Sequence, residues 1–124
     1  MKEDFRMKIV LPLDENKNDV CVSFARAPYF VFVDTKGGEK DIVDNPAAQA
    51  HGGAGVKAAQ VILDKGADAV LTVRLGENAA EAFNAAGIEI YKTLGNSIDE
   101  NVEAFIEGKL DKLTQFHAGF HGVH

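Results

Sequence analysis

The 124-residue sequence contains one cysteine, Cys21, three prolines and no tryptophan. A single cysteine excludes an intramolecular disulfide, and nothing in the chain indicates an oxidising compartment. No apolar stretch approaches the ~18–20 residues that a membrane span needs. The charged first residues are followed by no apolar core of a signal peptide. We therefore expect a soluble, cytoplasmic protein that does not bind membranes.

Positive charge is also scarce, because 13 Lys and Arg face 19 Asp and Glu for a formal net charge of −6. Such a chain lacks the basic field that attracts nucleic acid, so we expect no nucleic-acid partner. Its length and its 46% apolar and 26% charged residues are typical of one globular domain. We assign residues 1–113 to this domain, as a monomer or homodimer, and residues 114–124 to a His- and Gly-containing tail.

The hydrophobic pattern predicts an antiparallel hairpin followed by β-α-β-α units. Crossovers through helices require parallel strands, so the domain should be a three-layer α/β fold with a mixed sheet of about five strands and three helices. Helix starts and strand ends then meet at one sheet edge, where small ligands bind in such folds. The expected strands are 7–13, 29–34, 39–43, 67–73 and 88–91, and the expected helices are 54–65, 76–86 and 98 to about 108.

Helical spacing also predicts which residues face the core. For the first helix these are Val56, Ala59, Ile62 and Leu63, and for the third they are Ile98, Val102, Phe105 and Ile106.

A glycine-rich turn, His51-Gly52-Gly53-Ala54-Gly55, precedes the first expected helix. Glycine lets the backbone approach a ligand, and a helix start presents free N–H groups to an anion. His51 could add a bond to a metal ion. The turn is not a Walker loop, because no Gly-Lys-Ser/Thr follows. An anion or cluster cradle and a plain helix start with a solvated histidine both stay open.

Five segments in register resemble the dinitrogenase iron–molybdenum cofactor biosynthesis family over about residues 7–113. Members of that family have a ribonuclease-H-like fold, and those of nitrogen fixation bind iron–sulfur precursors of the nitrogenase cofactor and pass them between assembly proteins. The resemblance thus implies a cluster of iron–sulfur or iron–molybdenum type and donor and acceptor proteins as partners. The segments are Ala25-Arg26-Ala27-Pro28-Tyr29-Phe30, Asn45-Pro46, His51-Gly52-Gly53-Ala54-Gly55, Gly76-Glu77-Asn78-Ala79 and Ala85-Ala86-Gly87-Ile88.

The same resemblance makes two parts of the chain candidates for cluster binding, the segment after Cys21 and the glycine-rich turn. Ser23 stands where the family often has a histidine ligand, and Ala25 replaces a glycine. A neutral hydroxyl is a poor iron ligand, so Cys21 could serve instead, or it could be a small buried hydrophobe. The cluster-binding candidates are Ser23, Arg26, His51, Gly52, Gly53 and Gly55, with His51 and Cys21 as metal ligands.

The C-terminal segment carries three histidines, His117, His121 and His124, within eight residues. Three imidazoles can chelate a divalent ion such as zinc, nickel or copper. Gly119 and Gly122 argue against a stable helix there. A metal-binding tail and a tail with incidental metal affinity are both open.

Three functions are compatible with these patterns. The first is a non-catalytic carrier of a metal cluster, and the second is an anion- or partner-binding regulatory module without metal. The third, a two-metal nuclease, is disfavoured, because it needs converging carboxylates and Asp14, Asp34 and Asp68 occur at a turn, a hairpin end and a strand start. We expect that the protein is not an enzyme.

Overall fold

The computed structural model describes residues 6–117. Within them it has five strands, three α-helices and one 3₁₀ helix, in the predicted order and with ends that differ from the expected ones by at most two residues. Only the 3₁₀ helix has no counterpart among the expected elements. The elements are β1 (Lys8–Leu13), β2 (Tyr29–Asp34), β3 (Lys40–Asp44), η1 (Pro46–Gln49), α1 (Ala54–Asp64), β4 (Ala69–Thr72), α2 (Glu77–Ala85), β5 (Glu89–Lys92) and α3 (Ile98–Ile106).

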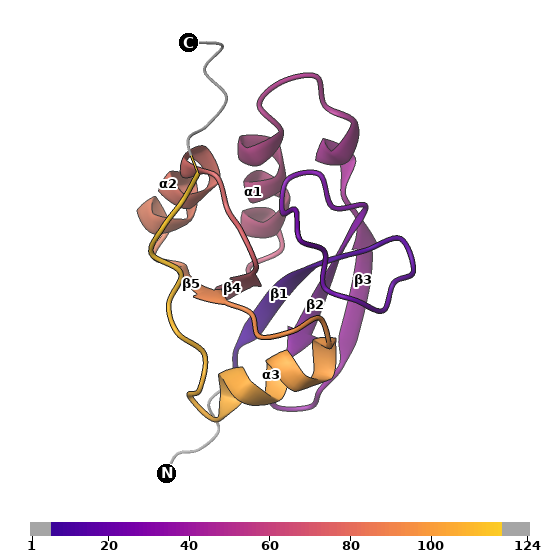
Figure 1. Ribbon diagram of the computed structural model, residues 1–124, viewed down its shortest axis with the longest axis vertical. Coiled ribbons are helices and arrows are strands. Elements are labelled where there is room, and N and C mark those ends of the chain that lie inside the picture. Colours follow the sequence, from indigo (N-terminus) through magenta and orange to yellow (C-terminus); the bar gives the residue numbers. More distant parts are fainter. Residues whose placement is uncertain (1–5, 118–124) are drawn as a thin grey trace.

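The five strands form one mixed sheet in the order β3-β2-β1-β4-β5. β2 pairs antiparallel with both β1 and β3, whereas β4 pairs parallel with β1 and with β5. Figure 1 shows α1 and α2 on one side of this sheet and α3 on the other. This three-layer, ribonuclease-H-like arrangement confirms the predicted fold class.

Alternating strand residues build a separate core on each face of the sheet, as the two-residue period of a strand requires. On one face Val10, Phe30 and Val70 pack with the buried residues of α1 and α2. On the other face Ile9, Val31 and Leu71 pack with α3. The sheet is therefore covered on both sides, which explains why β1 and β4 are apolar at nearly every position.

Two helix faces differ from the prediction. Val56 is 50% exposed, because α1 turns a row of small residues toward the core and toward α2. At Gly55 an added Cβ would lie 3.7 Å from the Cβ of Ala79, so the two helices approach closely. Ile106 in α3 is 55% exposed, whereas Asn101 is fully buried. Asn101 accepts a hydrogen bond from the Leu94 N–H (2.7 Å), so this buried amide holds the loop before α3.

The chain after α3 returns along the outer side of β5. The Lys92 N–H donates to the Asp111 carbonyl and the Leu113 N–H donates to the Ile90 carbonyl, both at 2.9 Å. His117 then forms a bridge with Gly76 at the start of α2. The predicted tail segment 114–124 thus begins with residues that contact the domain. His121 and His124 lie outside the described residues, so the three-histidine metal site stays a prediction.

Candidate functional site

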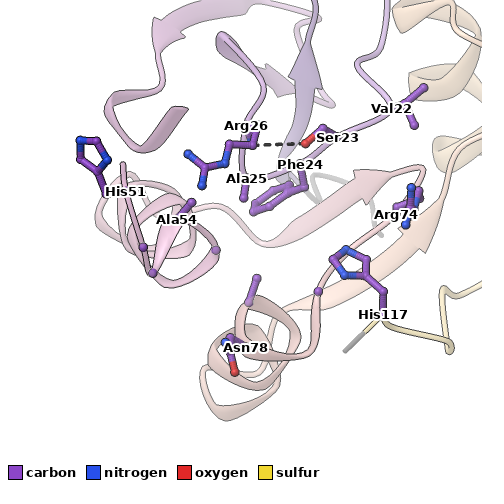
Figure 2. A pocket seen from close by; sticks show the side chains of 15 residues that line it. Val22, Ser23, Phe24, Ala25, Arg26, His51, Ala54, Arg74, Asn78 and His117 are labelled. Carbon is purple, nitrogen blue, oxygen red and sulfur yellow. Dashed lines mark hydrogen bonds between the residues drawn. The ribbon is translucent and has the colours of Figure 1, made fainter. Parts of the chain in front are cut away.

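A cavity of about 500 Å³ opens at the sheet edge where β1 and β4 end and where α1 and α2 begin. This is the edge at which the sequence predicted a ligand site, and the volume is within the range of small-molecule sites. Figure 2 shows the side chains around it. Four parts of the chain line the cavity: the segment 22–26, the glycine-rich turn 51–55, residues 74, 76, 78 and 79, and residue 117.

The first wall of the cavity is tied to its neighbour by Asn45, which is only 5% exposed. The Asn45 amide donates to the carbonyls of Ala25 (2.9 Å) and Ala27 (2.8 Å). Its side-chain oxygen accepts from the Ala47 N–H at 3.0 Å, which caps the start of η1. Three hydrogen bonds from one buried side chain therefore fix the segment that contains Ser23 and Arg26 against the segment that leads to His51.

Arg26 makes two sets of hydrogen bonds in this wall of the cavity. Its backbone N–H donates to the Ser23 hydroxyl (3.3 Å), the contact drawn as a dashed line in Figure 2. Its guanidinium donates to the carbonyls of Ala48 (3.2 Å) and Ala50, just before His51. The side chain is exposed and borders the cavity. Arg26 therefore holds the glycine-rich turn in place and brings a positive charge to the site.

Arg74 brings a second positive charge from the opposite wall, directly after β4. It is exposed, and no acidic side chain among residues 6–117 pairs with it. Figure 2 shows Arg26 with His51 on one side of the cavity and Arg74 with His117 on the other. A cation without a carboxylate partner can bind an anion without first breaking an ion pair.

The glycine-rich turn forms the start of α1 as predicted. Gly53 is the N-cap residue, its φ of 67° lies in the left-handed region, and no side chain caps the helix. At the start of α2, Gly76 is likewise an N-cap without a side-chain cap. The cavity therefore lies against two helix N-termini. At α2 the Glu77 N–H donates to the His117 carbonyl (2.9 Å), and the other first-turn N–H groups and the helix dipoles favour an anion.

The two histidines of the site differ in their surroundings. His51 is exposed, and its ring lies at the outer margin of the cavity in Figure 2. His117 is positioned by backbone pairing, since its N–H donates to the Leu75 carbonyl (3.2 Å) and its carbonyl accepts from the Glu77 N–H (2.9 Å). An added Cβ at Gly76 would lie 3.0 Å from Cε1 of His117, so the ring rests against that glycine.

Cys21 lies outside the cavity, unlike the other candidates from its segment. It is buried in the core between the sheet and α1 and α2. Burial, followed by a hydrogen bond with Asp14, raises the pKa of its thiol above the ordinary value. Because the thiolate is the form that binds metal, this environment disfavours Cys21 as a ligand.

The described residues contain no group of three or more His, Cys, Asp or Glu placed to hold a metal ion. The carboxylates considered for a nuclease are also separated. Asp34 ends β2 and Asp68 donates its N–H to the Lys8 carbonyl (2.7 Å), which places both at the sheet edge opposite the cavity. Asp14 follows β1 at the other edge.

The cavity has the opposite charge to the chain as a whole. Two of the three arginines and two histidines line it, whereas none of the Asp and Glu between residues 6 and 117 does. The sequence prediction included Ser23, Arg26, His51 and the three glycines of this lining, but it missed Arg74. The signal that could have identified Arg74 is its position directly after an expected strand, because ligands bind where the strands of such a sheet end.

Comparisons with known proteins agree with this fold. The family model described as "Dinitrogenase iron-molybdenum cofactor" matches residues 7–108. An uncharacterized protein of Methanocaldococcus jannaschii is 37% identical over 110 residues, which cover 86% of this chain and 92% of that protein. The apo form of the orange protein from Desulfovibrio gigas has a TM-score of 0.80 and 31% identity, covering 87% of this chain and 93% of that one. A proposed NifB protein from Thermotoga has a TM-score of 0.74 and 36% identity, covering 89% and 96%.

No helix among the described residues is long and apolar enough to cross a membrane.

Proposed function

Because the chain belongs to the dinitrogenase iron-molybdenum cofactor family, we propose that it is a non-catalytic carrier of an anionic metal–sulfur cluster, of iron–sulfur or iron–molybdenum type. The cluster is cargo, received from a donor protein and passed to an acceptor. One observation carries the proposal: a protein of net charge −6 has a cavity with two arginines and no carboxylate among its described lining residues.

The donors of this cavity suit a preassembled cluster that brings its own sulfides. Guanidinium groups, free N–H groups at helix starts and imidazoles bind anions through charge-assisted hydrogen bonds. The cavity has no thiolate, because Cys21 is buried elsewhere with a raised pKa. A cluster that needs four cysteine ligands does not fit it. His51 and His117 are the side chains that could add a direct bond to a cluster metal.

The relatives support binding of a separate group. The Desulfovibrio gigas structure is of an apo form, which implies that the same protein also exists with a group bound. In the present chain Ser23 does not offer the imidazole that many family members have at this place. Its hydroxyl instead accepts a hydrogen bond from the Arg26 N–H, so it shapes the wall. Charge and backbone N–H groups then supply most of the binding.

The test is anaerobic loading with iron and sulfide, followed by desalting and measurement of retained iron, sulfide and visible charge-transfer absorption. Wild type should retain a coloured cluster, and Arg74→Ala should retain several-fold less. Arg6→Ala is the matched control, because Arg6 pairs with Asp34 (3.2 Å) at the opposite sheet edge. Cys21→Ala should retain as much as wild type.

Two outcomes would contradict the proposal. A wild-type protein that stays colourless and retains no iron is not a cluster carrier. If such a protein still binds inorganic phosphate in a manner that depends on Arg74, the cavity serves a metal-free anion-binding module, the alternative that the same charge distribution supports. Loss of the cluster in Cys21→Ala, with the fold intact, would place the cluster outside this cavity.

A further inference from the structure

The two lateral strands of the sheet, β5 and β3, differ in whether another segment pairs with their outer side. At the β5 edge the returning segment pairs with the sheet through Tyr91 and Lys112. At the β3 edge no segment of residues 6–117 pairs with the outer side of the strand. An uncovered strand edge is a template for another strand, and proteins usually protect it with charges or bulges.

The hydrogen-bond pattern shows which residues of β3 face outward. The Asp34 N–H donates to the Glu39 carbonyl (3.0 Å), and the Asn45 N–H donates to the Pro28 carbonyl (3.1 Å), so residues 39 and 45 bond inward. An antiparallel ladder alternates, which makes 41 and 43 inward as well. The backbone groups of Lys40, Ile42 and Asp44 therefore point to the open edge.

The charges of the outward residues complement one another in one register. If two copies of β3 meet antiparallel about Ile42, all three outward residues of each strand find outward partners. In that register Lys40 of one copy lies opposite Asp44 of the other, twice over, and Ile42 faces its own counterpart. Within its own chain Lys40 pairs with Asp99 of α3 (Nζ to Oδ1, 2.5 Å), so Asp44 of the second copy would share this ammonium group with Asp99.

Exposed apolar surface continues from this edge on the α3 side. Ile42 is 43% exposed and shares a sheet face with Val31, which packs toward α3. A groove of about 330 Å³ between the hairpin and α3 has an apolar part, Val33, Val102 and Ile106, and a charged part that contains Lys40, Asp99, Glu103 and Glu107. Ile106 is 55% exposed. A second copy paired at β3 would cover apolar surface beside the strand as well as the strand itself.

We propose that β3 pairs antiparallel with β3 of a second copy of this chain, in the register that sets Lys40 against Asp44 and joins the two sheets into one. The interface is isologous, as a two-fold dimer requires. The cavity lies where β1 and β4 end and not along the outer side of β3, so it does not depend on this pairing.

The experiment is sedimentation velocity of the full chain from micromolar to millimolar concentration. The monomer mass is 13.3 kDa, and wild type should approach twice that value as concentration rises. Asp44→Lys and Lys40→Asp should each stay monomeric, because each places like charges opposite each other. Lys40→Asp also removes the ion pair with Asp99 of its own chain, so Asp44→Lys is the cleaner of the two variants. Glu81→Lys is the control, since it makes the same change in charge as Asp44→Lys at an exposed position on α2.

Mixing the two single variants decides the register. A Lys40→Asp chain paired with an Asp44→Lys chain has opposite charges at both contacts, so the mixture should dimerise although neither variant does so alone. The double variant Lys40→Asp/Asp44→Lys should dimerise by itself. Wild type that stays at 13.3 kDa at every concentration, or a dimer that survives Asp44→Lys unchanged, would overturn the proposal.

Discussion

Replacement of Asn45 by aspartate tests how the walls of the cavity are held together. The wild-type amide donates to the Ala25 and Ala27 carbonyls and accepts from the Ala47 N–H, all within 3.0 Å, from a position that is 5% exposed. Aspartate has the same shape but no N–H group to donate. In Asn45→Asp a carboxylate therefore faces two carbonyl oxygens that have lost their donors.

The magnitude follows from these contacts. Two buried hydrogen bonds are each replaced by a repulsive pair, and with about 1–1.5 kcal/mol for each lost bond the variant should lose roughly 3 kcal/mol of unfolding free energy at pH 7. For a domain of this size that corresponds to a melting temperature lower by about 10 °C. Asn45→Ala loses all three bonds without the repulsion, so at the same value for each bond it should lose about 3–4.5 kcal/mol.

The pH dependence separates the two variants. Burial and the facing carbonyls raise the pKa of the introduced carboxyl in the folded state above its unfolded value of about 3.9. The loss of unfolding free energy that the ionised carboxylate causes is therefore fully present above the folded pKa. It disappears as pH falls toward the unfolded pKa. The loss of stability in Asn45→Asp should therefore shrink as pH falls through that window, whereas the loss in Asn45→Ala should not change.

Denaturant unfolding at pH 7 and at pH 5 and 4.5 gives these free energies, with Asn84→Asp as the control at an exposed position on α2. The reasoning is refuted if Asn45→Asp loses less than about 1 kcal/mol, the lower end of the value of one such bond. A deficit that does not change with pH would show that the carboxylate does not face the carbonyls.

Three other predictions concern separate parts of the molecule. Gly53→Ala should cost about 1–2 kcal/mol of stability, because φ is 67° there, whereas Gly52→Ala, which has open space and no positive φ, should be nearly neutral in the same unfolding assay. Phe24→Ala should cost about 3–5 kcal/mol, since this buried ring packs on two other aromatic rings, and thermal unfolding measures the loss. The Cys21 thiol should react with iodoacetamide more slowly than a free cysteine at pH 8, because its pKa is raised; reaction at the free rate would contradict its burial.

The sequence was sufficient for the fold because its local signals agree with one another. β1 and β4 are apolar at nearly every position, and the structure buries them on both faces. Gly66 and Gly87 directly follow the expected helices 54–65 and 76–86, and each has a φ of 76° immediately after the C-cap residue. These signals depend on the period of a strand and on the freedom of glycine, so they can be recognised without knowing which elements touch.

What the sequence could not provide depends on contacts between distant segments. Val56 was assigned to the core, but the close approach of α1 to α2 through small residues turns it outward. His117 was assigned to a tail, but its pairing with Gly76 places it beside the cavity. Asn45 was quoted only as part of a motif, and its role is visible only once the carbonyls of the neighbouring wall are known.

The charge distribution also bears on how a carrier can release its cargo. A cluster bonded to cysteine thiolates must have those bonds broken during transfer. In the present cavity Arg26, Arg74 and two helix starts act through charge and N–H groups, and the lone thiol is buried elsewhere. Each such contact is weak enough to be exchanged singly for a contact from an acceptor protein. Under the proposed function, the absence of a thiolate from the described cavity lining is therefore what allows a cluster to be bound by this chain and still be passed on.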